Sequence, residues 1–454
     1  MTKNYHTVWI LILFVVSFFV VRIPLLQEPL GFEEGIFAEL IVHRPSGPFY
    51  ALTGRIDGEN IYGHISHPAF SYELLRLGGN LSRPFLTHDV YLNDSLVTPR
   101  LRIISSFYQF TFFGALLLFS LLRHSHDKKW PVLLIFAAML SPLAIKTSVH
   151  LQIDNTAGVL FCGTAALLFI TAGQIKVIGT RFLLVLAGGF IAGLGKQEWS
   201  FALLAALITI SVAMFFVKTT RDGHAIYMLL CATLGLAAGN LSSYLYDPVN
   251  YLRALHFIVY FSKLHETSSG SWELGHWLIL MKHRARFIFI CMVLSLPFLF
   301  SWFSRQHCGV FFYLTFFFGF YLLLGYIVSD WNYEPRYFCP SLAVLSVSAI
   351  ATTPGSVPRW PRMICLTATL LVFLSAIIFC IGFEPDRNLH LEKINKGTLQ
   401  SSQDTVLCIN SGSGWNKPNI NYVNNNMPFS ILEKSIWERY HKMLINPDDI
   451  DMAK

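Results

Sequence analysis

The sequence predicts an all-helical protein that crosses a membrane many times. Two observations predict this fold class. Of the 454 residues, 54% are hydrophobic and only 13% are charged, and the mean hydropathy is +0.50, which is too apolar for an ordinary soluble domain. The apolar residues also occur as separate runs, each close to the roughly 20 residues that cross about 30 Å of hydrocarbon. Because a backbone in lipid must satisfy its own hydrogen bonds, we expect these runs to form helices.

The runs predict about eleven membrane-spanning helices by this length rule. They lie at residues 8–26, 103–122, 130–145, 155–175, 181–195, 200–217, 224–244, 286–303, 308–328, 338–353 and 363–383. The first run ends in Arg22-Ile23-Pro24 without a small-residue cleavage site. We therefore expect it to be retained as a helix rather than removed as a signal peptide. The membrane domain then covers residues 1–383.

The basic residues of the short loops predict the orientation. They fall in alternate loops, and because cytoplasmic loops are rich in Lys and Arg, we place these loops in the cytoplasm. They are Arg123, Lys128, Lys129, Lys176, Arg181, Lys218, Arg221, Arg305, Arg359 and Arg362. The amino terminus is then cytoplasmic, and the segments 27–102, 246–285 and 384–454 lie on the outer side. The net charge of +7 mostly reflects this bias, so we expect no nucleic-acid partner.

The outer segments differ in composition from the predicted spans. Segment 27–102 contains amphipathic pieces at 32–42 and 70–77, interrupted by Pro and Gly, which predicts short helices on the membrane surface. The tail 384–454 is polar but contains Trp415 and Trp437. We expect it to form a small outer cap resting on the loops, since a segment of this size makes a thin core alone.

Two adjacent glutamates, Glu33 and Glu34, follow the first predicted span. Paired carboxylates at a membrane surface suit proton transfer, because two close carboxylates push their proton affinities apart. A plainer interpretation is that they lie in the first turn of a surface helix and complement its dipole. The sequence alone leaves both interpretations open.

Further candidate residues lie at the predicted outer ends of later spans. Lys196 and Arg336 are cations on the outer side, against the positive-inside bias. Both could instead extend to the interface, and Tyr337 could belong to the aromatic belt. Asp154 begins the fourth span, where it could also serve as a helix N-cap.

A histidine pair, His64 and His67, has a spacing that could place two metal ligands on one helical face. No third ligand at a fitting distance accompanies the pair in the sequence. We therefore expect no bound metal.

The candidate residues occur in an order that resembles a known family. The markers are Arg22-Ile-Pro24, Glu33-Glu34, His67-Pro-Ala-Phe-Ser-Tyr-Glu-Leu-Leu75, Arg102-Ile-Ile-Ser105, Asp154-Asn155, Lys196 and Arg336-Tyr337. In this order they resemble the protein O-mannosyltransferase and aminoarabinose-transferase group of C-type glycosyltransferases. The chain departs from the group's usual motifs in having Glu33 in place of aspartate and Ala69 in place of a second proline. Both departures keep the functional groups that the chemistry needs.

The resemblance implies a fold, an activity and roles. The fold would be a C-type glycosyltransferase bundle. The protein would move a sugar from a polyprenyl-phosphate donor to a glycan, lipid or protein hydroxyl at the outer membrane face, with inversion. Glu33 would be the general base; Glu34, Asp154 and His67 would orient the acceptor and the site. Lys196, Arg336, Arg102 and Tyr337 would contact the donor phosphate. The expected partners are these substrates, membrane lipid and the enzyme that makes the donor.

A transporter or flippase, or a polymerase or ligase of lipid-linked glycans, is the alternative function. A transporter should carry ionisable residues deep within helices that line a central path. Here the candidate charges lie near one membrane face, which favours an enzyme. The last residues, Asp451-Met-Ala-Lys454, resemble no retention signal, so we expect a bacterial inner membrane rather than an endoplasmic reticulum.

Overall fold

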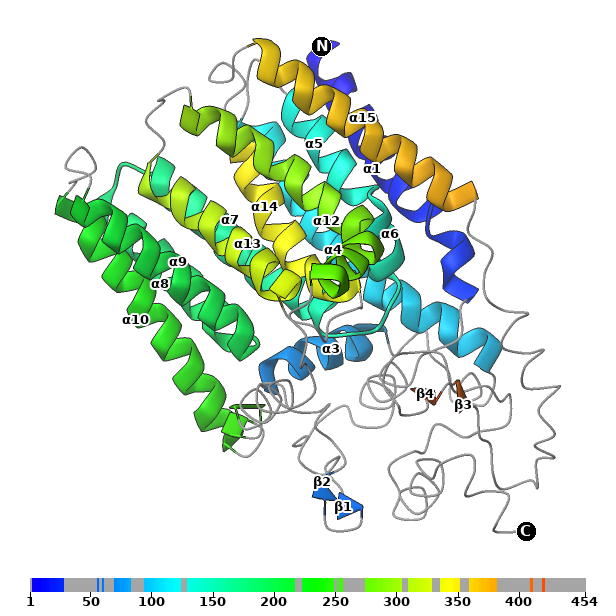
Figure 1. Cartoon of the computed structure of the whole chain (residues 1–454), viewed down its shortest axis with the longest axis horizontal. Coiled ribbons are helices and arrows are strands. Elements are labelled where there is room, and N and C mark those ends of the chain that lie inside the picture. Colours follow the sequence, from blue (N-terminus) through cyan, green and yellow to red (C-terminus); the bar gives the residue numbers. More distant parts are fainter. Residues whose placement is uncertain are drawn as a thin grey trace.

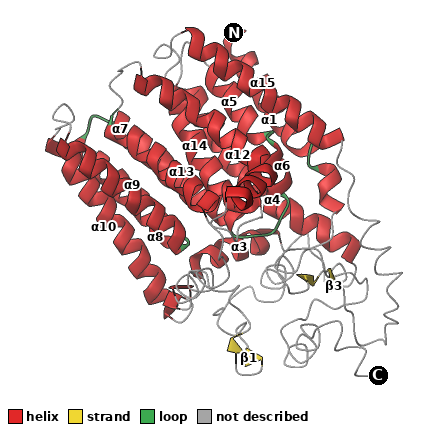
Figure 2. Ribbon diagram, in the orientation of Figure 1, coloured by secondary structure: helices red, strands yellow, loops and turns green. Residues whose placement is uncertain are grey.

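The structure is a computed structural model, and it is a bundle of long helices with a shorter helix across one end (Figures 1 and 2). It describes residues 2–27, 55–56, 59–60, 69–82, 94–123, 129–216, 223–248, 251–252, 254–255, 274–303, 309–328, 335–351, 359–381, 409–410 and 419–420. The predicted all-helical, polytopic fold class is confirmed. The described strands form only two antiparallel pairs of two residues each.

The helices of the membrane part follow the predicted runs. They are α1 (Thr2–Val20), α4 (Asp94–Arg123), α5 (Lys129–Met139), α6 (Pro142–Ser148), α7 (Val159–Gln174), α8 (Ile178–Leu194), α9 (Gln197–Phe216), α10 (Gly223–Tyr246), α12 (Leu274–Phe303), α13 (Val310–Val328), α14 (Cys339–Ala351) and α15 (Arg359–Ile381). The remaining elements are the 3-10 helices η1 (Ile23–Gln27) and η8 (Pro335–Phe338), the π-helix η6 (Asp154–Gly158), α3 (Ala69–Ser82), β1 (Arg55–Ile56), β2 (Glu59–Asn60), β3 (Ile409–Asn410) and β4 (Asn419–Ile420).

Every predicted span contains a helix, but the helices differ in whether they are long and apolar enough to cross a membrane. Among the described residues, six helices are long and apolar enough to cross a membrane, and a seventh span results if α5 and α6 are counted together. Helices α1, α8 and α12 contain shorter apolar stretches. The remaining predicted span, at 338–353, is the short helix α14. Helices α4 and α12 begin well before their predicted spans, so part of each predicted outer segment is helical.

Helix α14 forms the centre of the bundle. All of its residues are buried, and it packs against α7, α12, α13 and α5. Its 13 residues extend only about 20 Å at 1.5 Å per residue, which is shorter than the hydrocarbon layer. Protein rather than lipid therefore surrounds α14. In Figure 1, α8, α9 and α10 lie on one side of this centre, and α1 and α15 lie on the other.

Helices α8 and α10 approach each other through glycine. A Cβ added to Gly189 of α8 would collide with the Ala232 carbonyl of α10, and one added to Gly235 of α10 would collide with the Leu186 carbonyl of α8. Small residues let membrane helices approach closely enough for backbone contact. This contact positions the end of α8, which leads directly to Lys196.

The predicted span at 130–145 is broken rather than continuous. Helices α5 and α6 meet at an angle of 54°. Ser141 caps α6 by accepting a hydrogen bond from the Ala144 N–H at 3.2 Å, and Pro142 occupies the first turn of α6. A break of this kind leaves carbonyl groups without their helical donors, and these groups need other partners in a membrane.

Arg22 supplies hydrogen bonds at this break. The fully buried guanidinium donates to the carbonyls of Met139 at 3.0 Å and Ala144 at 3.3 Å, and its Nε donates to Ser148 Oγ at 2.5 Å. It also donates to the Phe18 carbonyl of α1 at 2.8 Å. The arginine of the Arg-x-Pro marker therefore joins the end of α1 to both halves of the broken span.

Helix α3 lies across one end of the bundle, where it packs against η6, α4 and α10 (Figure 1). The Tyr108 hydroxyl of α4 donates to the Leu74 carbonyl of α3 at 2.6 Å. At the other side, the Tyr246 hydroxyl of α10 donates to Glu73 Oε1 at 2.9 Å, and the Tyr246 ring stacks on Phe70. The predicted surface helix at 70–77 is therefore present and is fixed to two membrane helices.

Candidate functional site

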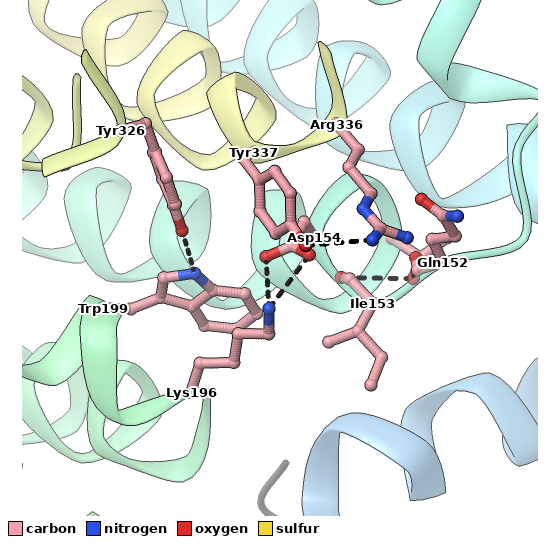
Figure 3. Close-up of polar contacts among 9 residues, drawn as sticks. Gln152, Ile153, Asp154, Lys196, Trp199, Tyr326, Arg336 and Tyr337 are labelled. Carbon is pink, nitrogen blue, oxygen red and sulfur yellow. Dashed lines mark hydrogen bonds and ion pairs between the residues drawn. The ribbon is translucent and has the colours of Figure 1, made fainter. Parts of the chain in front are cut away.

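Three helix ends that are distant in the sequence meet at the end of the bundle where α3 lies. They are η6 with the start of α7, the link between α8 and α9, and η8 with the start of α14. The side chains of Asp154, Lys196, Arg336 and Tyr337 come from these ends and gather in one place (Figure 3). We call these four side chains the Asp154 cluster.

Asp154 opens the π-helical turn η6. In this turn the Gly158 N–H donates to the Ile153 carbonyl at 2.8 Å, a bond that spans five residues instead of four. Ile153 occupies the N-cap position, and no side chain makes a capping hydrogen bond there. The alternative that Asp154 serves as the helix N-cap is therefore wrong. π-Helical turns are rare and are frequent at functional sites.

Lys196 pairs with Asp154. Its Nζ lies 2.9 Å from Oδ1 and 3.0 Å from Oδ2 of the carboxylate, and the two residues are only 2% and 3% exposed. The alternative that Lys196 extends to the membrane interface is therefore wrong. Loss of either partner would leave a buried charge without compensation, which makes the pair strongly interdependent.

Tyr337 lies close to two cations. The Lys196 Nζ is 5.3 Å from the centre of its ring, and the Arg336 Cζ is 4.7 Å from it. Arg336 Nη2 also donates to the Tyr337 hydroxyl at 2.9 Å. Both distances are within the range of cation–π attraction. Arg336 is 6% exposed, so its guanidinium is held within the protein rather than at the aqueous surface.

The loop before Asp154 is held by side chains. Asn155 Nδ2 donates to the carbonyls of Thr147 at 2.6 Å and His150 at 2.5 Å. Arg102 Nη1 of α4 donates to the Val149 carbonyl at 3.1 Å, and the Ser105 hydroxyl donates to the His150 carbonyl. This loop is largely buried and non-helical, so its carbonyls depend on these donors. Arg102 and Ser105 of α4 thus support the segment that presents Asp154.

The structure brings together four of the predicted site residues and relates a fifth to them indirectly. Asp154, Lys196, Arg336 and Tyr337 form the Asp154 cluster. The hydrogen bond described for Arg102 joins it to the loop before Asp154, so its predicted contact with donor phosphate stays a prediction. Glu33, Glu34 and His67 lie outside the described residues, and their roles stay predictions as well.

Two aromatic residues beside the cluster were not predicted from the sequence. Trp199 is fully buried, and its indole Nε1 donates to the Tyr326 hydroxyl at 3.2 Å (Figure 3). The Tyr326 ring stacks on Tyr337 with their centres 5.5 Å apart. One signal was available, because Trp199 lies one helical turn after Lys196. Aromatic residues at span ends are common, however, so this signal alone does not distinguish a site from an aromatic belt.

The described residues contain no group of three or more His, Cys, Asp or Glu side chains arranged to hold a metal ion. The described cysteines are free, and those near the site lie in packed surroundings. Cys339, for example, donates a hydrogen bond from Sγ to Thr147 Oγ1 at 3.0 Å. The chemistry available in the Asp154 cluster itself is therefore that of one carboxylate, two cations and one aromatic hydroxyl.

The fold and the site define a polytopic helical membrane protein with a buried charged cluster at one end of its bundle. The structure of ArnT from Cupriavidus metallidurans in the apo state is similar to it over 88% of this chain and 67% of that chain, with a TM-score of 0.49 and 16% sequence identity. No protein-family model matches the sequence, and no curated protein matches it. A similarity of this extent assigns no activity to the chain.

Proposed function

We propose that the protein is a membrane glycosyltransferase that transfers a sugar from a polyprenyl-phosphate donor to an acceptor at one membrane face, with inversion. In this scheme Glu33 is the general base, and Glu34, Asp154 and His67 orient the acceptor and the site. Lys196, Arg336, Arg102 and Tyr337 act on the donor phosphate. The scheme requires no metal ion.

One observation supports this proposal above the others. Asp154, Lys196 and Arg336-Tyr337 belong to three markers of the ordered sequence pattern, and their side chains lie in one buried cluster. Residues kept only for capping or for interface anchoring would have no reason to converge. Convergence of separate charged markers is expected if they serve one reaction centre.

The chemistry of the cluster fits a phosphate leaving group. When the bond from sugar to phosphate breaks, negative charge grows on the phosphate oxygens and must be met by fixed cations. A guanidinium can contact two of these oxygens at once, and an ammonium supplies a compact point charge. Arg336 and Lys196 supply one of each beside Tyr337. In buried surroundings their interaction with a phosphate would be stronger than in water.

The placement of the cluster favours an enzyme over a transporter. Asp154, Lys196 and Arg336 all lie at helix ends, at the end of the bundle where α3 lies. A transporter of lipid-linked sugars would need ionisable groups near the middle of the bilayer. We therefore place the reaction at a single membrane face. By the loop charges this is the outer face, with the amino terminus in the cytoplasm and the tail outside. We propose a bacterial inner membrane as the location, because the last residues resemble no retention signal.

The acceptor and the sugar are left open by the proposal. A lipid-linked saccharide, a lipid headgroup and a protein hydroxyl all present a hydroxyl group, which is a poor nucleophile at neutral pH. Each would need a carboxylate to accept its proton as the new bond forms. The carboxylate proposed for this step, Glu33, follows the helix α1 that Arg22 joins to the rest of the bundle.

The experiment is transfer of labelled sugar from polyprenyl-phosphate donors in nanodiscs by the wild-type protein and by Glu33→Gln. This change keeps the shape of the side chain and removes its basicity. We expect transfer by the wild type and a loss of roughly 100-fold or more in the variant, the scale of a removed general base. Equal transfer by both proteins would contradict the role of Glu33 and would move the base to Glu34 or Asp154.

A second pair of variants tests the donor site. Arg336→Lys keeps the charge but removes the planar fork, and we expect it to raise the KM for the donor at least about tenfold. Arg181→Lys is the matched control, because Arg181 lies in the first turn of α8, at the opposite end of that helix from Lys196. If wild-type protein transfers no sugar from any donor but moves lipid-linked sugar across the bilayer, the transporter function replaces this proposal.

A further inference from the structure

Trp199 lies where the three segments of the Asp154 cluster meet. Its backbone N–H donates to the Lys196 carbonyl at 3.1 Å, so it stands one turn after Lys196 in α9. A Cβ added to Gly195, the neighbour of Lys196, would collide with the indole ring. A Cβ added to Gly158, at the end of the turn that Asp154 opens, would lie 2.7 Å from Trp199 Cζ2 and 2.9 Å from Pro340 Cγ of α14.

A hydrogen bond extends these contacts to Tyr337. The Trp199 indole donates to the Tyr326 hydroxyl at 3.2 Å, and the Tyr326 ring stacks on Tyr337 at 5.5 Å and 29°. The Tyr337 ring in turn lies 5.3 Å from the Lys196 ammonium. The backbone of Lys196 is therefore connected to the Lys196 side chain by successive contacts of Trp199, Tyr326 and Tyr337 (Figure 3).

We infer that Trp199 and Tyr326 are positioning residues that fix the Lys196 ammonium and the Tyr337 ring relative to each other. The inference rests on the proposed function only in assigning donor phosphate to this cluster. The two residues act through Lys196 and Tyr337. A flexible lysine side chain has several rotatable bonds, and holding its ammonium in one place lowers the entropic cost of binding an anion.

The hydrogen bond, rather than packing alone, carries this role. Two phenylalanines could fill the same region without any polar atom to satisfy, whereas a buried indole N–H and a phenol each need a partner. The bond also holds the Tyr326 hydroxyl in place, and with it the position of the ring on which Tyr337 stacks. Because Gly158 and Gly195 leave room only for the flat indole, the donor atom has little freedom to move.

The chain contains a matched control for this hydrogen bond. Helices α9 and α13 are joined a second time by Thr209 Oγ1 and the Tyr321 hydroxyl, 2.7 Å apart. Tyr321→Phe removes a phenol from the same helix pair but touches no residue of the Asp154 cluster. Comparing it with Tyr326→Phe separates positioning from general support of the α9–α13 contact.

The experiment measures the acylation rate of Lys196 by an amine-reactive reagent in the full-length protein in nanodiscs, resolved by mass spectrometry. Lys196 is protected in the wild type because it is buried and paired. Loss of one neutral hydrogen bond should raise its labelling rate about 3- to 10-fold in Tyr326→Phe. The rate in Tyr321→Phe should stay within about twofold of the wild type. Equal labelling of Lys196 in the two variants would overturn the inference.

A further variant and a binding measurement complete the test. Trp199→Phe should raise labelling as well, and the double variant Trp199→Phe/Tyr326→Phe should add little to either single change, because both remove one hydrogen bond. Binding of a long-chain polyprenyl monophosphate should weaken about 3- to 10-fold in Tyr326→Phe and stay unchanged in Tyr321→Phe. If labelling changes as expected but wild-type protein does not bind the polyprenyl monophosphate, the positioning role stands and the proposed donor site fails.

Discussion

Replacing Lys196 with methionine should expose the cost of the buried pair. Methionine has a similar length but no charge, so the Asp154 carboxylate, 3% exposed, would lose the ammonium that contacts both of its oxygens. Removing one partner of a buried ion pair lowers the free energy of unfolding by about 3–5 kcal/mol. The second variant, Asp154→Leu/Lys196→Met, leaves no buried charge at either position, and apolar replacement of a whole pair is often neutral. We therefore expect the double variant to be more stable than Lys196→Met.

The assay is equilibrium unfolding in mixed micelles, followed by the denaturant midpoint of each variant. A double-mutant cycle should give a coupling free energy of at least about 1 kcal/mol, since contacting residues are not additive. Glu73→Gln is the control, because Glu73 and Arg76 lie 3.0 Å apart but the Glu73 side chain is 25% exposed. Because the Arg76 side chain is only 6% exposed, this pair is partly shielded from water, and we expect the change to cost less than Lys196→Met but more than the roughly 0–1 kcal/mol of a fully exposed pair. Additive effects of the Asp154 and Lys196 changes would refute the pairing.

Three further predictions concern the parts of the fold that hold the site. Arg22→Lys should lower the free energy of unfolding by about 1–3 kcal/mol, because an ammonium cannot reach all the acceptors of the guanidinium at the α5–α6 break. Thermal unfolding in detergent tests this, and an unchanged midpoint would contradict it. Asn155→Leu removes two hydrogen bonds to the loop and should also lower the free energy of unfolding by about 1–3 kcal/mol. Hydrogen exchange of the backbone amides in residues 147–153 should become faster in this variant. Gly189→Ala should lower the free energy of unfolding by about 1–3 kcal/mol, because the added Cβ would force α8 away from α10. Gly179→Ala, at a position where an added Cβ meets nothing within 4 Å, should be neutral or stabilising. Equal effects of the two changes would be inconsistent with the close contact between α8 and α10.

The sequence predicted the helices well because run length and apolarity are local properties. It did not predict the break at Ser141, since the apolar residues continue through it, although Ser141-Pro142 is a recognisable start of a new helix. It also missed the early start of α12, because Lys282, Arg284 and Arg286 separate the first residues of this helix from the apolar run. These differences concern where helices begin and bend, which neighbouring helices influence.

The site could be predicted only as a set of separate residues. Asp154 and Lys196 are 42 positions apart, and Trp199 and Tyr326 are 127 positions apart. Spacing along the chain contains no information on such pairs. The ordered markers indicated which residues to consider, and the orientation rule placed them near one face. Which carboxylate meets which cation depends on how α7, α9 and α14 pack, and this is a property of the folded bundle.

The π-helical turn at Asp154 adds one residue to the first turn of the helix that continues as α7. Removing a single residue between 154 and 158 would allow an ordinary α-helix to form through this segment, which is normally the more stable hydrogen-bond pattern. Asp154 and the residues before it would then turn by about 100° relative to α7. The carboxylate would turn away from Lys196 although every residue of the cluster would still be present. The number of residues in this one turn, as much as their identity, therefore determines whether Asp154 and Lys196 form their ion pair.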